Sequence, residues 1–378
     1  MDLVSFCHIR WNFVYQRPQH LLNRFAINNR VFVIEEPNYD KESNCYELKK
    51  DDQYNLWVVN FNISNDVPLN RRNEVLQELI DTFFLAEKID QYILWYYSPM
   101  ALKYSDQLNS AVTVYDCMDE LSAFKFADPE LKKMEKILLN KADIVFTGGQ
   151  SLYEAKKDLH HNIHSFPSSI DKAHFKSARI AQSEPSDEAM IPHPRFGFYG
   201  VIDERFDIEL LKGLAEKRPD WHWVLIGPII KIDPAALPSN ENIHYLGGKD
   251  YNDLPAYLSG WDVATLPFAL NESTKFISPT KTPEYLAGGK KVISTSITDV
   301  VNPYGVEGLV YIADTVDDFI AAGEEILQNS DDKIWKIKVD NFLLNISWDE
   351  TWNDMSSLID QAIENKSIKT FKKSKAYV

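Results

Sequence analysis

The sequence predicts an α/β protein made of two successive domains. Short runs rich in β-branched and aromatic residues alternate with helical patterns from end to end, as in parallel sheets with crossover helices. The chain has 378 residues, which is long for one hydrophobic core and ample for two. A polar, proline-containing segment interrupts the alternation at 177–194. Because ligands of such sheets bind beyond the carboxyl ends of the strands, we expect the functional site in a cleft between the domains.

The first half of the chain predicts a parallel sheet of its own. Candidate strands occupy residues 3–7, 30–35, 56–60, 92–96, 111–115, 144–147 and 163–166. Candidate helices occupy residues 18–26, 71–88, 100–108, 129–140 and 150–159. Pro99 and Pro129 each stand at a first helical position, where the missing N–H group is tolerated.

A second α/β series begins after the polar segment. Its candidate strands occupy residues 196–199, 223–226, 243–246, 263–266, 292–294 and 310–312. Its candidate helices occupy residues 208–217, 254–259, 281–288, 316–329 and 348–363. We therefore expect a first domain at 1–176, a linker at 177–194, a second domain at 195–345, and a last helix with a basic tail at 346–378.

Composition and charge exclude several classes of protein. The formal net charge of −16 argues against a nucleic-acid partner, because a phosphate backbone requires clustered lysine and arginine. The sequence contains no run of roughly 18 apolar residues, which is the length needed to cross a bilayer. The first residues lack the features of a signal peptide, and Cys7, Cys45 and Cys117 lie far apart without a CxxC pair. We expect a cytoplasmic protein.

The C-terminal tail is a local exception to the acidic composition. Its basic residues are Lys366, Lys369, Lys372, Lys373 and Lys375, with Phe371 and Tyr377 between them. Such a tail is either a solvated, frayed terminus or a contact with anionic lipid headgroups. The second interpretation would place the protein at the inner face of the membrane.

The start of the helix at 281–288 combines groups that suit a phosphorylated ligand. Ser278, Thr280 and Lys281 stand where the helix begins, so hydroxyls, backbone N–H groups and an ammonium can converge on one anion. Glu284 lies in the first turn and can accept hydrogen bonds from two hydroxyls of a ribose. The alternative is an ordinary helix start, with Glu284 as a favourable N-terminal charge and Lys281 as a surface cation.

A series of motifs in the second half, taken in order, is more specific than any one of them. The motifs are Leu225-Ile226-Gly227-Pro228, Ile243-His244-Tyr245-Leu246-Gly247-Gly248, Trp261-Asp262-Val263-Ala264-Thr265-Leu266-Pro267 and Pro283-Glu284-Tyr285-Leu286-Ala287-Gly288-Gly289-Lys290-Lys291-Val292-Ile293-Ser294. This order resembles the retaining glycosyltransferases of family 4. The resemblance implies the GT-B fold, in which two Rossmann-like domains face each other across a cleft and a C-terminal helix crosses back to the N-terminal domain.

The resemblance also assigns donor-binding roles. It implies that Glu284 holds the nucleotide ribose, that Ser278, Thr280 and Lys281 contact phosphate, that the turn at Gly200 faces the diphosphate, and that Gly227 belongs to a second glycine turn of the donor site. The family often has a second glutamate eight positions before this one, where this chain has Phe276; Glu272 is a nearby substitute. Arg205 is our candidate for a bidentate contact with the diphosphate. Its alternative is a surface ion pair with Asp203 or Glu204.

The loop after the first strand is a candidate acceptor site. His8, Arg10, Trp11, Gln16 and Arg17 crowd a segment where family 4 enzymes usually have a glycine-rich turn. The pattern His-x-x-Trp followed by Gln-Arg-Pro-Gln-His resembles a bacterial subgroup linked to cell-surface polysaccharide synthesis. Its helix start suits a phosphate or sugar. For the histidine of that helix, His20, packing is an equal alternative.

Carboxylates follow the strand at 111–115, at the edge of the sheet where chemistry is expected. Asp119 is our first candidate for a general base on an acceptor hydroxyl, and Asp116 is the second. A retaining enzyme can also work without such a base, and carboxylates at this position can simply cap the next helix.

The function that we expect is transfer of a sugar from a nucleoside diphosphate sugar, such as a UDP-sugar, to a glycan or a lipid-linked acceptor. Lys281 and Arg205 would stabilise the leaving diphosphate. No Asp-x-Asp pair is present, so we expect a metal-independent enzyme without a cofactor. The alternatives are a nucleotide-sugar epimerase of the same fold and a non-catalytic sugar-binding protein, because a fold alone does not establish chemistry.

Overall fold

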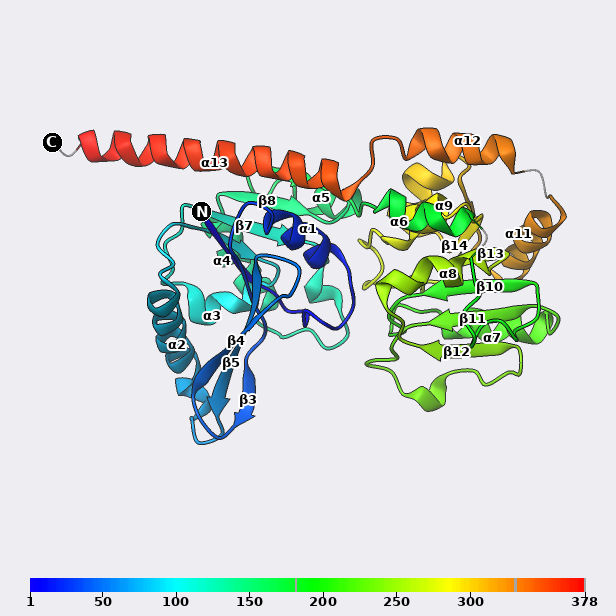
Figure 1. Ribbon diagram of the computed structural model, residues 1–378, viewed down its shortest axis with the longest axis horizontal. Coiled ribbons are helices and arrows are strands. Elements are labelled where there is room, and N and C mark those ends of the chain that lie inside the picture. Colours follow the sequence, from blue (N-terminus) through cyan, green and yellow to red (C-terminus); the bar gives the residue numbers. More distant parts are fainter. Residues whose placement is uncertain (181, 330–331, 377–378) are drawn as a thin grey trace.

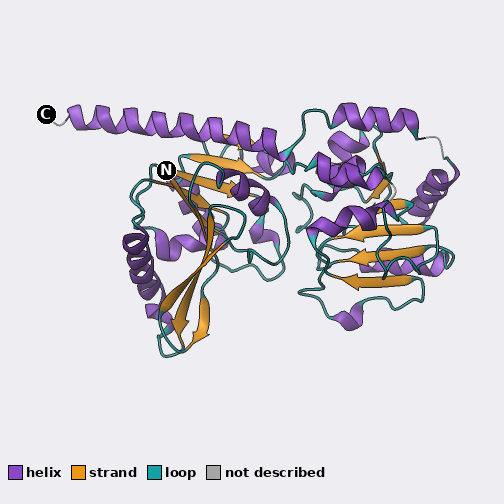
Figure 2. Ribbon diagram, in the orientation of Figure 1, coloured by secondary structure: helices purple, strands orange, loops and turns teal. Residues whose placement is uncertain are grey.

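The computed structural model describes residues 1–180, 182–329 and 332–376, and it contains two α/β domains (Figure 1). Helices lie on both faces of each sheet (Figure 2). In each sheet the first strand lies between the second strand and a strand later in the chain, which is the topology of doubly wound nucleotide-binding domains.

The first sheet has the strand order β3-β5-β2-β1-β6-β7-β8-β9, with β4 antiparallel to β5. The strands are β1 (Asp2–Phe6), β2 (Val31–Ile34), β3 (Asn38–Lys41), β4 (Cys45–Lys50), β5 (Leu56–Ser64), β6 (Tyr92–Tyr96), β7 (Val112–Cys117), β8 (Ile144–Thr147) and β9 (Ile163–Ser165). The switch point lies between β1 and β6, where connections leave the sheet in opposite directions and a crevice opens.

Two hydrophobic cores cover the two faces of this sheet. Side chains of α2 (Arg72–Glu87), α4 (Leu131–Lys141) and α5 (Gln150–Lys156) contribute to one core, which the short α3 (Leu102–Ser105) joins. Side chains of α1 (Arg17–Phe25) and of the last helix, α13 (Trp348–Ala376), form the other. The first domain therefore needs the C-terminal end of the chain to complete its core.

The second sheet is entirely parallel, with the order β12-β11-β10-β13-β14-β15. The strands are β10 (Arg195–Tyr199), β11 (His222–Ile226), β12 (Ile243–Gly247), β13 (Val263–Leu266), β14 (Val292–Ser294) and β15 (Val310–Ile312). The helices are α6 (Lys172–Lys176), α7 (Ile208–Lys217), α8 (Leu254–Ser259), α9 (Lys281–Ala287), α10 (Thr298–Val300), α11 (Val316–Gln328) and α12 (Lys333–Phe342). The switch point lies between β10 and β13.

The chain crosses between the domains twice. Ile170, Phe175 and Ala178 are buried in the core of the second domain, so the first crossing lies just after β9, ahead of the linker expected from composition. The segment 182–194 is itself docked on the second domain, where Glu188 Oε1 accepts a hydrogen bond of 2.7 Å from Trp261 Nε1. The return crossing meets the first, because the Trp348 N–H donates to the Ile170 carbonyl over 3.1 Å.

The last helix runs along the first domain and ends far from the second (Figure 1). This is the crossing-back helix of the predicted fold. It continues past residue 363, where the sequence pattern ended it, and Lys366 pairs with Asp143 over 2.7 Å. The side chains of the other tail lysines, Lys369, Lys372, Lys373 and Lys375, and those of Phe371 and Tyr377, lie outside the described residues. No described helix has the length and hydropathy needed to cross a membrane.

Candidate active site

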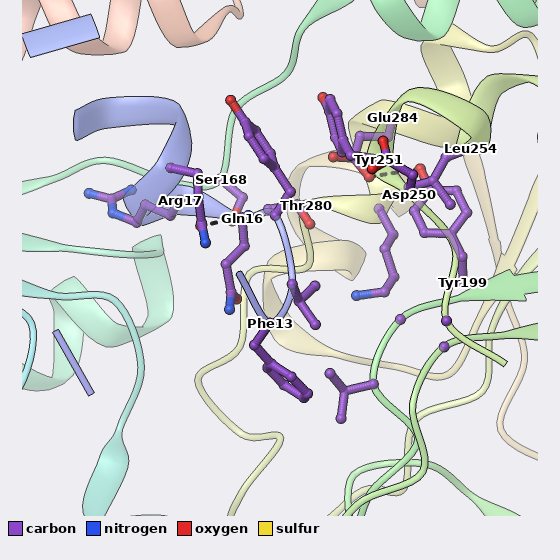
Figure 3. Close-up of a pocket in the computed structure, with 18 of the residues that line it drawn as sticks. Phe13, Gln16, Arg17, Ser168, Tyr199, Asp250, Tyr251, Leu254, Thr280 and Glu284 are labelled. Atoms are coloured by element: carbon purple, nitrogen blue, oxygen red, sulfur yellow. Dashed lines mark hydrogen bonds between the residues drawn. The ribbon is translucent and has the colours of Figure 1, made fainter. Parts of the chain in front are cut away.

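A cleft of about 1120 Å³ lies between the two domains, at the carboxyl ends of both sheets. First-domain walls come from the loop after β1 with the start of α1, the β4–β5 loop at 51–54, the loop after β7 and the β8–α5 turn. The second domain contributes the turns after β10, β11 and β12 and the start of α9. Figure 3 shows Gln16 and Arg17 on one side of this space and Tyr199 and Glu284 on the other.

Two glycines allow the turns of the second domain to lie against each other. Gly200 and Gly227 have φ values of +146° and +143°, which side chains rarely tolerate. A Cβ atom on Gly227 would lie 1.8 Å from the Gly200 carbonyl oxygen, and one on Gly200 would lie 2.2 Å from Lys281 Cε. The missing side chains therefore leave the space in which the lysine of α9 crosses the end of β10.

Lys281 lines the cleft and forms no ion pair with any residue that the structure describes. Burial lowers the pKa of its ammonium to about 8, although Glu284 acts in the opposite direction. Its Nζ atom lies 5.8 Å from the centre of the Phe198 ring. Lys281 is partly buried at the end of β10 and has no carboxylate partner in the described part of the chain, which suits it to an anionic ligand.

Glu284 is buried and oriented by one hydrogen bond. Tyr199 donates its hydroxyl to Glu284 Oε2 over 2.7 Å, and Tyr285 accepts from the Tyr199 N–H over 3.0 Å. Burial raises the pKa of Glu284 to about 7. Its Oε1 atom has no hydrogen-bond partner among the described residues, which leaves one carboxylate oxygen for a hydroxyl in the cleft.

Ser278 and Thr280 line the cleft beside Lys281. Thr280 precedes α9 without a side-chain capping hydrogen bond. The Ser278 carbonyl accepts a hydrogen bond of 2.5 Å from Ser168 of the first domain. Because α9 is short, charge stabilisation at this place rests on the Lys281 ammonium more than on the helix dipole.

Arg205 lines the cleft, but Asp203 already holds its guanidinium. Their two side chains form a bidentate pair with distances of 2.7 to 3.2 Å, the arrangement that the sequence left as the alternative. The pair does not lie on open surface, since Asp203 is buried and the guanidinium lies 5.3 Å from the Phe124 ring of the first domain. Asp203 therefore neutralises much of the positive charge that Arg205 brings to the cleft.

The two candidate bases differ in accessibility. Asp119 lines the cleft, and its carboxylate accepts no hydrogen bond from the described part of the chain. Burial raises its pKa to about 6, against the effect of Arg205 and Arg17. Asp116 is fully buried and is held by the Arg17 guanidinium at 2.9 to 3.1 Å. Asp116 therefore has a structural role, and it is not accessible to act as a base in the cleft.

Arg17 lines the cleft, but its charge is shared with Asp116 and its Nη1 donates to the Phe166 carbonyl over 2.8 Å. Gln16 also lines the cleft, and its side chain and that of Gln19 close a capping box at the start of α1. Trp11 lines the wall but has little exposed surface. Its backbone N–H donates to Glu35 Oε1 over 2.6 Å. These residues therefore determine the shape of the acceptor wall and contribute little net charge to it.

Three expected contacts lie outside the cleft. Arg10 turns to the first sheet and pairs with Glu35 over 3.0 Å, with Asn38 and Asn60 as further partners. His8 is shielded, and burial lowers the pKa of its imidazole to about 4. Glu272 is exposed and is not a wall residue, so it does not replace the missing family glutamate in this structure.

Aromatic contacts that the sequence did not indicate join the domains beside the cleft. Tyr15 stacks on Tyr251 with ring centroids 4.5 Å apart, and Tyr251 stacks on His174 at the same distance. His20 packs against Trp348 at 4.7 Å, which is the packing role left open for it. Phe13 is exposed within the cleft. Tyr15 lies within the loop that the sequence indicated as an acceptor site, and Tyr251 lies in the turn after β12; no sequence motif indicated that the two would meet.

Comparisons with known proteins indicate the class of protein to which this site belongs. No family model matches the chain. A curated protein, the putative teichuronic acid biosynthesis glycosyltransferase TuaH of Bacillus subtilis (strain 168), is 25% identical over 283 residues, which cover 69% of this chain and 68% of the relative.

Solved structures match almost the whole length of the chain. The sucrose-phosphate synthase of Thermosynechococcus elongatus superimposes with a TM-score of 0.69 and 14% identity, over 97% of this chain and 100% of the other. A trehalose-6-phosphate structure from E. coli with bound UDP-2-fluoro glucose gives 0.67 and 13%, over 95% and 99%. The fold is GT-B, and together with the curated relative it makes the chain a glycosyltransferase.

Proposed function

We propose that this glycosyltransferase moves a sugar from a nucleoside diphosphate sugar to a glycan or lipid-linked acceptor in cell-surface polysaccharide synthesis. One observation carries the proposal: the Lys281 ammonium, which forms no ion pair with a described residue, and the oriented carboxylate of Glu284 line the same cleft as Asp119 and the turns of Gly200 and Gly227. The similarity to a protein named for teichuronic acid biosynthesis supports the surface-polysaccharide part.

The donor would lie on the second domain. Glu284 would accept hydrogen bonds from the ribose, and Lys281 would contact the diphosphate, with Ser278 and Thr280 beside it. When the bond from the sugar to the diphosphate breaks, the electron pair leaves with the phosphate oxygen. An ammonium that is already positioned at the diphosphate stabilises this charge with little reorganisation. Arg205 would add to the stabilisation only as far as Asp203 releases it.

The acceptor hydroxyl would enter from the first domain. Its oxygen bonds to the anomeric carbon, and its proton passes either to Asp119 or to the departing phosphate oxygen. A carboxyl whose pKa is about 6 is suited to take a proton near neutral pH. Retention of configuration is part of the proposal, through the resemblance to family 4. Product analysis by NMR with the donor as the reference anomer tests it.

Metal independence and the lack of a cofactor are further parts of the proposal. They rest on the sequence, which has no Asp-x-Asp pair. Turnover that persists in excess EDTA would support metal independence, and turnover that returns only with added Mg²⁺ or Mn²⁺ would contradict it. We also propose that the protein contacts the membrane surface peripherally, where a lipid-linked acceptor would be found.

The decisive experiment is a screen of nucleotide sugars with two matched variants. Lys281→Ala removes the ammonium in the cleft, and Lys275→Ala removes an exposed ammonium six positions upstream. We expect thermal stabilisation by at least one nucleotide and release of nucleoside diphosphate in the presence of acceptor. The first variant should lose both and the second should keep both.

Product analysis with donor alone separates the alternatives. An epimerase would convert or hydrolyse the donor without acceptor, and a binding protein would leave it intact. The epimerase and binding-protein alternatives agree less well with the curated relative, which is named as a glycosyltransferase. If no nucleotide or nucleotide sugar stabilises the protein, the donor site proposed here is wrong.

A further inference from the structure

The exposed side of α4 carries a group of cations that the mechanism does not use. Lys132, Lys133 and Lys136 are exposed, and none of them forms an ion pair with a residue of the described ranges. At 100° per residue these positions span about a quarter turn of the helix surface, so they share one face. Ile137 borders this face and is 40% exposed. The opposite side of α4 is the buried one, through Leu138 and its neighbours.

The loop that leads from the cleft into α4 carries a further exposed cation and an exposed aromatic ring. Phe126 is 66% exposed, and Lys125 Nζ lies 5.7 Å from the centre of its ring. The loop begins at Asp119 in the cleft, and Phe124 contacts Arg205 on the way. We call Lys125, Phe126, Lys132, Lys133, Lys136 and Ile137 the α4 surface. One end of it is thus connected to the reaction site by a few residues.

The nearby acids are engaged by other groups and not by the three exposed lysines of α4. Lys103 lies 2.5 Å from Glu130 and 3.9 Å from Asp128, and Lys156 pairs with both Glu120 and Glu135 over 2.7 Å. Asp106 is held by Lys141 over 2.8 Å, and Glu204 accepts a hydrogen bond of 3.4 Å from the Lys125 backbone N–H. Within the described chain, the α4 face itself therefore carries three cations without ion pairs, on a protein whose net charge is −16.

We propose that the α4 surface docks the enzyme on a bilayer rich in anionic lipids. The inference deepens the proposed function, since it identifies the part of the chain that would bring the cleft to a lipid-linked acceptor. Lysines next to anionic headgroups gain electrostatic free energy, and an exposed aromatic ring beside them is suited to the headgroup boundary. Charge complementarity decides the occupant: a positive, partly apolar strip on an acidic protein matches an anionic surface with an apolar interior.

Vesicle sedimentation of the full chain tests the proposal. The wild type should bind vesicles made of equal parts phosphatidylglycerol and phosphatidylcholine, should bind less as salt screens the charges, and should not bind pure phosphatidylcholine. The triple variant Lys132→Gln, Lys133→Gln, Lys136→Gln should bind roughly 100-fold more weakly, since three additive contributions of about 1 kcal/mol each give a little over two powers of ten. Phe126→Ser should weaken binding as well, at unchanged net charge.

A control triple removes the same charge elsewhere. Lys41, Lys49 and Lys212 are also exposed and form no ion pair within the described part of the chain, so their change to Gln should leave binding as it is. Equal loss in both triples would reduce the effect to net charge and overturn the proposal. So would wild-type protein that ignores anionic vesicles, or that stays bound after the α4 change but is released by removal of residues 369–378.

The readout is independent of catalysis. Transfer to a water-soluble acceptor should be unchanged in the α4 triple variant, whereas transfer to an acceptor in vesicles should fall with binding. If the proposed transfer fails altogether, the sedimentation result still stands. If sedimentation fails while soluble transfer works, only the docking surface is wrong. Binding of the α4 surface to an acidic protein but not to anionic vesicles would also overturn it.

Discussion

Whether a charged side chain at the cleft is available for chemistry depends on its partner. Arg17 pairs with Asp116, and Arg205 pairs with Asp203. Each carboxylate neutralises most of the positive charge that its arginine would otherwise present to a ligand. Lys281 has no such partner among the described residues, and burial moves its pKa instead. The residues left free are the ones that titrate near neutral pH, which makes pH a direct probe of the site.

Donor affinity should fall as the pH rises through about 8. In the unliganded protein Lys281 loses its proton there, because burial lowers its pKa, while the diphosphate stays ionised. Above that pH the loss should approach a factor of about 10 per pH unit. Lys281→Arg keeps its charge at high pH, so its affinity should stay level. Calorimetry with the nucleoside diphosphate across this range measures both; an equal fall in the two proteins would assign the titration to another group.

Glu284→Gln should weaken binding of a ribonucleoside diphosphate by roughly 10- to 100-fold, the value of a hydrogen bond to a charged group. The same variant should bind the 2′,3′-dideoxy analogue as well as the wild type does, because the ribose hydroxyls are then absent. Tyr199→Phe is the matched variant for orientation, since it removes only the hydroxyl that holds Oε2. A loss of affinity that is the same for both nucleotides would show that Glu284 acts on folding or on another part of the ligand.

The expected site residues fall into two groups for a physical reason. Lys281 and Glu284 are placed by local structure, the start of one helix, and a sequence pattern can indicate that. Arg10 and Asp116 are placed by distant partners: Glu35 lies 25 residues from Arg10, and Arg17 lies 99 residues from Asp116. No local pattern in a single sequence records such a pairing, so their removal from the site required the structure.

At the scale of elements, buried strands and well-capped helices could be predicted. α7, α8, β13 and β14 have the expected bounds, and each has a clear apolar face or a flanking helix cap. β3 and β4 were missed, because their Asn, Asp, Lys and Glu residues have low strand propensity. They are strands through backbone pairing with β5. α12 was not predicted; only Val339 of its residues is fully buried, and Trp335 and Phe342 are partly buried against the second-domain core.

One helix of the first domain takes its N-terminal partner from the second. The Ser151 N–H near the start of α5 donates to Asp299 Oδ1 over 2.9 Å, while the N-cap residue, Gly149, has no side chain to offer. A Cβ on Gly149 would lie 2.2 Å from Asp299 Oδ2 and 2.9 Å from Ser278 Cβ. The contact between the domains therefore depends on the absence of one methyl group.

Gly149→Ala should push the two domains apart beside the donor segment. We expect transfer activity to fall about tenfold or more, since a shift of about 1 Å in a reaction site can cost 100-fold. Small-angle X-ray scattering should show a larger radius of gyration. Gly248→Ala is the control for the dimensions of the molecule, because its Cβ would meet nothing within 4 Å, and it should leave the radius of gyration unchanged. Wild-type activity and dimensions in the Gly149 variant would mean that the domains yield at this contact without consequence.

At the scale of the whole molecule, the two domains have separate cores and share a site. The second-domain core includes Ile170 and Phe175, and the first-domain cores include Trp348 and Met355, so each domain borrows a segment from beyond its own sheet. The domains meet through Tyr15 and Tyr251 and through the crossings. Such an arrangement allows one domain to be stabilised by a ligand while the far edge of the other is left alone.

Nucleotide binding should therefore slow amide hydrogen exchange unevenly. The residues assigned to the donor all belong to the second domain, and a ligand at about 100 times its Kd stabilises the domain that binds it by about 2.7 kcal/mol. We expect slower exchange in the turns after β10 and β11 and at the start of α9, and unchanged exchange in the strands β3, β4 and β5 themselves, apart from the β4–β5 loop that lines the cleft. Lys281→Ala should abolish the difference. Protection that is as strong in β3–β5 as at α9 would contradict this, because the nucleotide would then bind the first domain or close both domains as one unit.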